Sequence, residues 1–145
     1  MLDLTLAIAH HVLIFALFGV LVVELATVKK GMGQTAITQV AAVDLWYGIL
    51  AALILAVGLI RAYFSAKGWA YYSHNAFFWA KIGVFLLIGL LSAPPTIFFI
   101  KTRRAEAIPA DAEISRVRMF LHLEAVLFLL LPGFAAAMAR GYGAF

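Results

Sequence analysis

Hydrophobic positions are grouped into four long apolar runs, and three short polar connectors separate these runs. The apolar runs are approximately Leu4–Val28, Val40–Phe64, Phe77–Ile100 and Met119–Ala139. Each run is at least as long as the ~20 residues that a helix needs to cross ~30 Å of hydrocarbon. Backbone groups in lipid must pair internally, and the two-residue alternation of membrane barrel strands is absent. The pattern therefore predicts four transmembrane helices.

The composition supports an integral membrane protein rather than a soluble domain. The 145 residues are 66% hydrophobic and 12% charged, whereas soluble domains are about 45–50% apolar and about 25% charged. Such an apolar surface is stable in contact with lipid tails, whereas its exposure to water is unfavourable. We predict an all-α, integral membrane four-helix bundle that forms a single domain over residues 1–145, with the lipid bilayer as its main partner.

The first run has no basic start and contains His10 and His11, so we expect a membrane helix rather than a signal peptide.

The distribution of basic residues predicts the orientation in a bacterial inner membrane. The first and third connectors, with the helix ends beside them, carry seven basic residues: Lys29, Lys30, Lys101, Arg103, Arg104, Arg116 and Arg118. The positive-inside rule places these connectors in the cytoplasm and both termini on the periplasmic side. The net charge of +4 is too scattered for a nucleic-acid surface, so we expect no nucleic-acid partner. Because there are no cysteines, thiolate-bound metals and iron–sulfur clusters are excluded.

Titratable residues inside the apolar runs are the strongest functional signal, because ionisable groups in hydrocarbon are costly unless they meet a partner, water or a ligand. An outer layer near the termini holds His10, His11, Arg61, Trp79 and Lys81. Neutral imidazole is a good axial ligand for haem iron, and cationic side chains suit tetrapyrrole carboxylates. We therefore predict a site for haem b or another tetrapyrrole, with a quinone as an alternative ligand. The competing interpretation is that Arg61 and Lys81 only extend to lipid headgroups.

An inner layer lies near the opposite membrane face and holds Glu24, Asp44, Arg118, His122 and Glu124. Its carboxyl groups and imidazole could bind a divalent metal, with Glu24, His122 and Glu124 as candidate ligands, or relay protons. Two simpler interpretations stay open. Arg118 could neutralise one carboxylate, and Asp44 could cap the start of its helix.

The vertical spacing of the histidines favours one histidine ligand for a haem. His10 and His122 enter from opposite membrane faces, each roughly 9 Å deep in a core of ~30 Å, so they differ in height by more than ~10 Å. His10 and Glu24 are 14 residues apart, close to four helical turns, and therefore share one face of the first helix. His10 is accordingly the predicted ligand of the haem iron.

Six stretches distributed over the chain are distinctive: Ala9–His11, Asp44–Gly48, Phe77–Lys81, Ser92–Pro95, Arg118–Glu124 and Met138–Gly143. On these stretches the chain resembles a family of small bacterial membrane proteins known only as a domain of unknown function. More distantly, the layout is similar to the HemJ-type protoporphyrinogen oxidases, four-helix membrane proteins that bind haem b and oxidise a porphyrinogen. This second resemblance implies His10 as the helix-one histidine, with Lys81 and Arg118 as catalytic residues.

Together these features favour a membrane redox protein that binds haem b or another tetrapyrrole, with an oxidoreductase of the HemJ type as the expected activity. Two alternatives stay open. One is a proton or ion pathway through the inner-layer carboxyl groups. The other is a cofactor-free subunit of a larger membrane complex, or a homo-oligomer, because four helices leave little chain outside the bilayer.

Overall fold

The computed structural model describes residues 2–65 and 67–145, and in these residues the chain is helical with no strand. Its helices are α1 (Leu2–Thr27), α2 (Gln34–Phe64), α3 (Gly68–Ser73), α4 (Ala76–Arg104), α5 (Asp111–Phe128) and α6 (Leu130–Ala139). Four segments of the described residues are long and apolar enough to cross a membrane: α1, α2, α4, and α5 together with α6. The predicted all-α class with four candidate spans is confirmed.

The helices extend beyond the apolar runs that predicted them. α2 begins at Gln34 rather than near Val40, and α5 begins at Asp111 rather than near Met119. Hydropathy marks the part of a helix that lies in hydrocarbon, whereas the helix continues into the polar region wherever its backbone hydrogen bonds persist. The fourth span is interrupted at Leu129, three residues before Pro132, because proline lacks an amide donor and its ring crowds the carbonyl four residues earlier.

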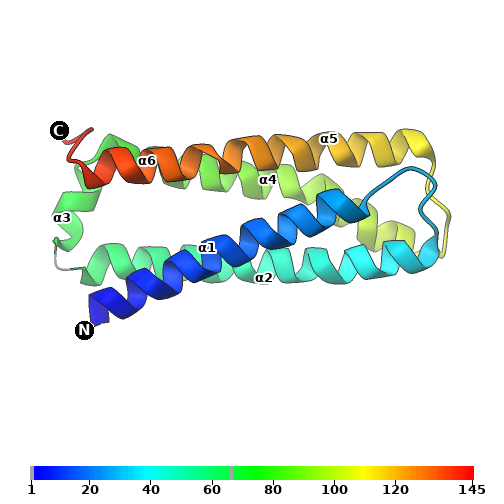
Figure 1. The fold of residues 1–145 in the computed structure, drawn as a ribbon, viewed down its shortest axis with the longest axis horizontal. Coiled ribbons are helices and arrows are strands. Elements are labelled where there is room, and N and C mark those ends of the chain that lie inside the picture. Colours follow the sequence, from blue (N-terminus) through cyan, green and yellow to red (C-terminus); the bar gives the residue numbers. More distant parts are fainter. Residues whose placement is uncertain (1, 66) are drawn as a thin grey trace.

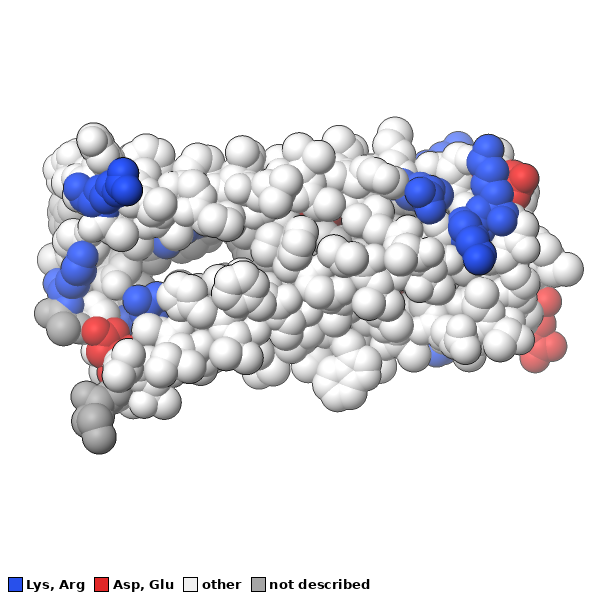
Figure 2. Space-filling view, in the orientation of Figure 1, with Lys and Arg blue, Asp and Glu red and all other residues white. Residues whose placement is uncertain are grey.

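The four spans lie side by side and run alternately up and down (Figure 1). Both termini and α3 lie at one end, which we call the terminal end. The connectors 28–33 and 105–110 lie at the other, which we call the basic end. Lys and Arg gather at the two ends and leave an apolar middle (Figure 2). Large apolar side chains such as Phe15, Trp46 and Leu90 point outward, as expected for contact with lipid tails.

The main core occupies the middle and the basic half of the bundle. Leu17 and Leu21 of α1 are buried there against Ile88, Phe99 and Leu121 from the other spans. A smaller cluster of Ala62, Tyr72 and Phe78 holds the terminal end. The two clusters leave the space between α1 and α6 unfilled at the terminal end, and the candidate site lies there.

The C-terminal tail is attached to the start of α4. The buried Asn75 side chain donates to the carbonyl of Tyr142 at 3.0 Å and accepts from the amide of Phe77 at 3.0 Å. The amide of Ala76 donates to the carbonyl of Gly143 at 2.7 Å. Gly143 has φ +79°, and a Cβ there would lie 2.6 Å from the Phe77 ring, so only glycine fits. This tail closes the terminal end beside α3 and α6.

Candidate functional site

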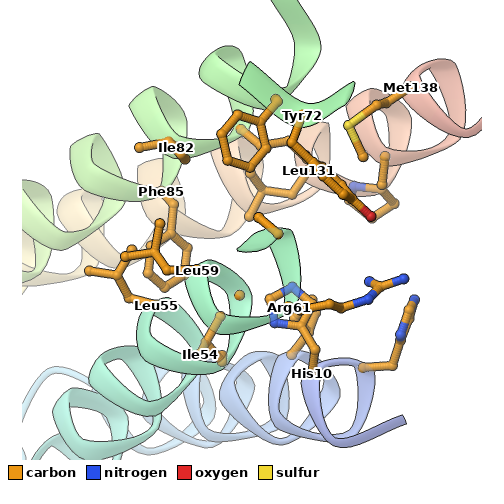
Figure 3. A pocket seen from close by; sticks show the side chains of 18 of the residues that line it. His10, Ile54, Leu55, Leu59, Arg61, Tyr72, Ile82, Phe85, Leu131 and Met138 are labelled. Carbon is orange, nitrogen blue, oxygen red and sulfur yellow. The ribbon is translucent and has the colours of Figure 1, made fainter. Parts of the chain in front are cut away.

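A cavity of about 510 Å³ lies among the spans at the terminal end. Its mouth carries the polar side chains of His10, His11, Arg61, Lys67, Tyr71 and Lys81. Its deeper wall, toward the middle of the bundle, is apolar and includes Ile54 and Phe85 (Figure 3). Phe128 also lines the cavity. The cavity is thus amphipathic, with a cationic mouth and an aromatic and aliphatic floor. Its volume is in the range of about 300–1,000 Å³ that is usual for small-molecule sites.

The ring of His10 is directed away from its own helix and lies against α2. Gly58 makes this possible, because a Cβ at that position would lie 3.0 Å from His10 Cε1. The Nδ1 atom of His10 is buried and has no hydrogen-bond partner among the described residues. By contrast, Nδ1–H of His11 donates to the carbonyl of Ala7 at 2.6 Å, the usual helical alternative. His10 is therefore an imidazole held in place by packing, with its hydrogen-bonding capacity unused.

The mouth of the cavity has an excess of positive charge. Arg61 comes from the last turn of α2 and Lys81 from the second turn of α4, and both charges act on His10. The Nε atom of Arg61 is buried without a hydrogen-bond partner among the described residues. The described lining contains no Asp or Glu to offset these cations. An anionic group in the cavity would be stabilised by charge-assisted hydrogen bonds.

Tyr71 and Lys67 extend the polar mouth on the side of α3. The Tyr71 hydroxyl donates to the carbonyl of Met138 at 2.7 Å and so attaches α3 to α6. The Lys67 ammonium lies 4.3 Å from the centre of the Tyr71 ring and 3.3 Å from its hydroxyl oxygen. Neither residue was identified from the sequence as part of the site. Both lie in a polar connector, whereas the site was predicted from titratable residues inside the apolar runs.

The cavity is open sideways between α1 and α6. In the described residues no Cα atom of α1 lies within 8 Å of a Cα atom of α6, although each helix packs against other spans. Ile14 and Phe15 of α1 line one side, and Pro132 and Ala135 of α6 line the other. Figure 2 shows the hollow in the bundle surface near the terminal end. A lipid-soluble molecule could therefore reach the cavity from the bilayer without passing through water.

Of the five residues predicted to bind a cofactor, four line the cavity: His10, His11, Arg61 and Lys81. Trp79 does not line it. Its side chain is 49% exposed, and its indole N–H donates to the carbonyl of Ser73 at 2.9 Å. Because Trp79 is two residues before Lys81, it lies about 200° around the helix and faces outward.

Arg118 and His122 lie on α5 toward the basic end, and neither lines the cavity. The Arg118 guanidinium donates to the carbonyls of Leu25 and Val28, which end α1. His122 is exposed, and its Nδ1–H donates to the carbonyl of Arg118 at 2.6 Å. The two residues expected to be catalytic, Lys81 and Arg118, are thus at opposite ends of the molecule. The hydrogen bonds of Arg118 attach α5 to the end of α1.

Three carboxyl groups are buried between the middle and the basic end, on Glu24, Asp44 and Glu124. Asp44 accepts a hydrogen bond from the Thr96 hydroxyl at 2.8 Å. Within the described ranges no three His, Cys, Asp or Glu side chains are arranged to hold a metal ion. His122, which we expected beside Glu24 and Glu124, is turned to the outside of the bundle.

The comparison with known proteins decides the family. The sequence model of a family described as predicted membrane protein (DUF2214) matches residues 2–143, nearly the whole chain. The chain belongs to this family. Membership in an uncharacterised family of membrane proteins, predicted from the sequence, is thereby confirmed. No curated protein and no solved structure matches the chain, so its activity has to be inferred from the cavity.

Proposed function

We propose that this membrane protein binds an acidic tetrapyrrole in the cavity at the terminal end, with haem b as the first candidate. One observation carries the proposal: the cavity joins an apolar floor to a mouth where His10 Nδ1 has no hydrogen-bond partner and where no Asp or Glu of the described lining offsets Arg61 and Lys81. Titratable side chains in hydrocarbon are costly, and each needs a partner, water or a ligand. An apolar ring system with carboxylate substituents would satisfy all three side chains at once.

The residues fit such a ligand in kind and in position. His10 would be the single histidine ligand of the iron, since His11 is bonded to its own helix and His122 does not line the cavity. Arg61 and Lys81 would hold the carboxylates. Phe85 and Phe128 would contact the ring system. When bound, haem iron held by His10 would supply a redox centre.

The sideways opening supports a lipid-soluble reaction partner. Since the gap between α1 and α6 faces the bilayer, a porphyrin-like or quinone-like substrate could enter from the acyl chains. This would be consistent with an oxidoreductase similar to the HemJ-type protoporphyrinogen oxidases. In that reaction Lys81 would act at the cavity, by holding an acidic substituent of the substrate. Arg118 would contribute only through the stability of α1.

The absorbance spectrum of protein purified in mild detergent from haem-replete cells tests this function. We expect a Soret band in the wild type that is lost in His10→Ala. His122→Ala is the matched control, because it removes an exposed imidazole that does not line the cavity, and it should keep the band. Colourless wild-type protein, or a Soret band that His10→Ala leaves unchanged, would exclude haem ligation by His10.

A further inference from the structure

A second set of buried polar side chains lies away from the ligand cavity, between the middle and the basic end. Glu24 of α1, Asp44 and Tyr47 of α2, and Glu124 of α5 are 1%, 5%, 3% and 0% exposed. Thr96 of α4 joins them through its hydrogen bond to Asp44. All four spans therefore contribute a polar group at one place in the apolar core.

Most of these polar atoms lack a partner. Glu24 Oε1, both carboxyl oxygens of Glu124 and the Tyr47 hydroxyl are buried with no hydrogen-bond partner among the described residues. The Tyr47 hydroxyl lies near Glu124, Glu24 and Asp44 but makes no hydrogen bond to them in the described residues. A buried hydroxyl without a partner is uncommon, because the lost contact with water is not replaced. Tyr47 is thus a second kind of buried polar group, beside the acids, whose hydrogen bonding is incomplete at this place.

The three carboxyl groups lie close enough to affect one another. Glu24 is affected by Asp44 and Glu124, and Glu124 is affected by Asp44. α4 contributes the neutral Thr96, whose hydroxyl donates to Asp44. On α5, Arg118 is engaged with the carbonyls at the end of α1, and His122 is exposed. Three ionised carboxyl groups without a counter-charge would be too costly in such an interior.

We propose that Glu24, Asp44, Tyr47 and Glu124 form an occluded proton-binding site, in which the carboxyl groups hold and share protons within the hydrocarbon region. Bound protons remove the repulsion between the acids and supply the missing donors. A protonated carboxyl group can donate to a neighbouring carboxyl oxygen or to the Tyr47 hydroxyl. A metal ion is a poorer occupant, since no metal-binding arrangement occurs among the described side chains.

The proton-binding site is independent of the ligand cavity. His10 and Glu24 are separated by 14 residues of α1, or about 21 Å. The fully buried Leu17 and Leu21 lie between them and belong to the main core. A colourless protein that failed the haem test would therefore leave this second site untouched, and the reverse also holds.

Infrared spectroscopy of the protein in lipid bilayers tests the proposal. At pH 7 a water-exposed carboxyl group is ionised, so any absorption of a protonated carboxyl group reports buried acids. We expect such a band in the wild type, and a shift of that band when water is replaced by heavy water. Glu24→Gln and Glu124→Gln should each remove part of the band. Glu113→Gln, at the exposed start of α5, is the matched control and should leave it unchanged.

The wild-type spectrum alone decides the case if a Gln variant fails to fold. A protonated-carboxyl band that persists at pH 7 supports the proton-binding site. The absence of such a band at pH 7 would overturn the proposal. A band of full size in Glu24→Gln, Asp44→Asn and Glu124→Gln alike would also overturn it, because the protonated acid would then lie elsewhere.

Discussion

The ring of His10 lies over Gly58, so close that a Cβ on Gly58 would be 3.0 Å from His10 Cε1. This contact joins α1 to α2 and sets the direction of the imidazole into the cavity. A glycine in a helix is less favourable than alanine by roughly 0.5–1 kcal/mol. Gly58 is needed at this position, because a larger residue would displace the proposed iron ligand, His10.

A side chain at Gly58 should therefore impair ligand binding without unfolding the bundle. We expect Gly58→Val to move the His10 ring and weaken haem binding by about tenfold or more, equivalent to roughly 1.4 kcal/mol. Gly48→Val on the same helix is the matched control, since Gly48 is exposed and a Cβ there meets nothing within 4 Å. Titration of the purified variants with haem, followed by absorbance, measures the effect. Equal affinities in the two variants would disprove the role of the His10–Gly58 contact.

Neutral substitutions at the cavity mouth should weaken binding of an acidic ligand. Hydrogen bonds to charged groups are worth about 1.5–3 kcal/mol, so we expect Arg61→Gln and Lys81→Gln each to reduce affinity by roughly tenfold. Arg140→Gln is the control, because Arg140 is exposed and does not line the cavity. The same haem titration provides the measurement. If Arg61→Gln and Arg140→Gln behave alike, the cations at the mouth do not hold the ligand.

Arg118 should prove important for stability and unimportant for the cavity. Its guanidinium satisfies the carbonyls of Leu25 and Val28 at the end of α1. Loss of such a charged donor should cost about 1.5–3 kcal/mol. We expect Arg118→Gln to lower the melting temperature, while Arg116→Gln, at an exposed position two residues earlier, should have little effect. Thermal unfolding monitored by circular dichroism compares the two variants. A haem affinity that falls in Arg118→Gln at unchanged melting temperature would instead support a role at the ligand.

The C-terminal tail offers a test of backbone strain. Gly143 has φ +79°, and a Cβ would lie 2.6 Å from the Phe77 ring, whereas Gly141 has φ +83° and free space around it. Alanine in the left-handed region costs roughly 1–2 kcal/mol, so Gly141→Ala should lose about that amount. Gly143→Ala should lose more, because the Phe77 ring must also move. Limited proteolysis of the tail measures the difference, and equal protection in both variants would contradict this packing.

The sequence was sufficient for the spans because their physical cause is local. Runs of apolar residues longer than a bilayer crossing have few alternatives in lipid. The helix ends were not predictable from hydropathy, since Gln34 and Asp111 begin their helices in the polar region. Which side of the membrane each end faces stays a prediction from the count of basic residues.

The candidate site was predictable only in part, because it depends on how the helices pack. His10, Arg61 and Lys81 were detectable as titratable residues inside apolar runs. The contact of His10 with Gly58 was not, because it requires the crossing of α1 over α2. Trp79 was predicted to belong to the outer layer with Lys81, and helical rotation places it on the outside.

Native mass spectrometry of the protein extracted from its own membranes tests the ligand cavity most directly. We expect a species whose excess mass equals one haem b for each chain, present in the wild type and in His122→Ala and absent in His10→Ala. A wild-type chain that carries only phospholipid or no ligand at all, or a haem adduct that persists in His10→Ala, would contradict a tetrapyrrole held by His10 in this cavity.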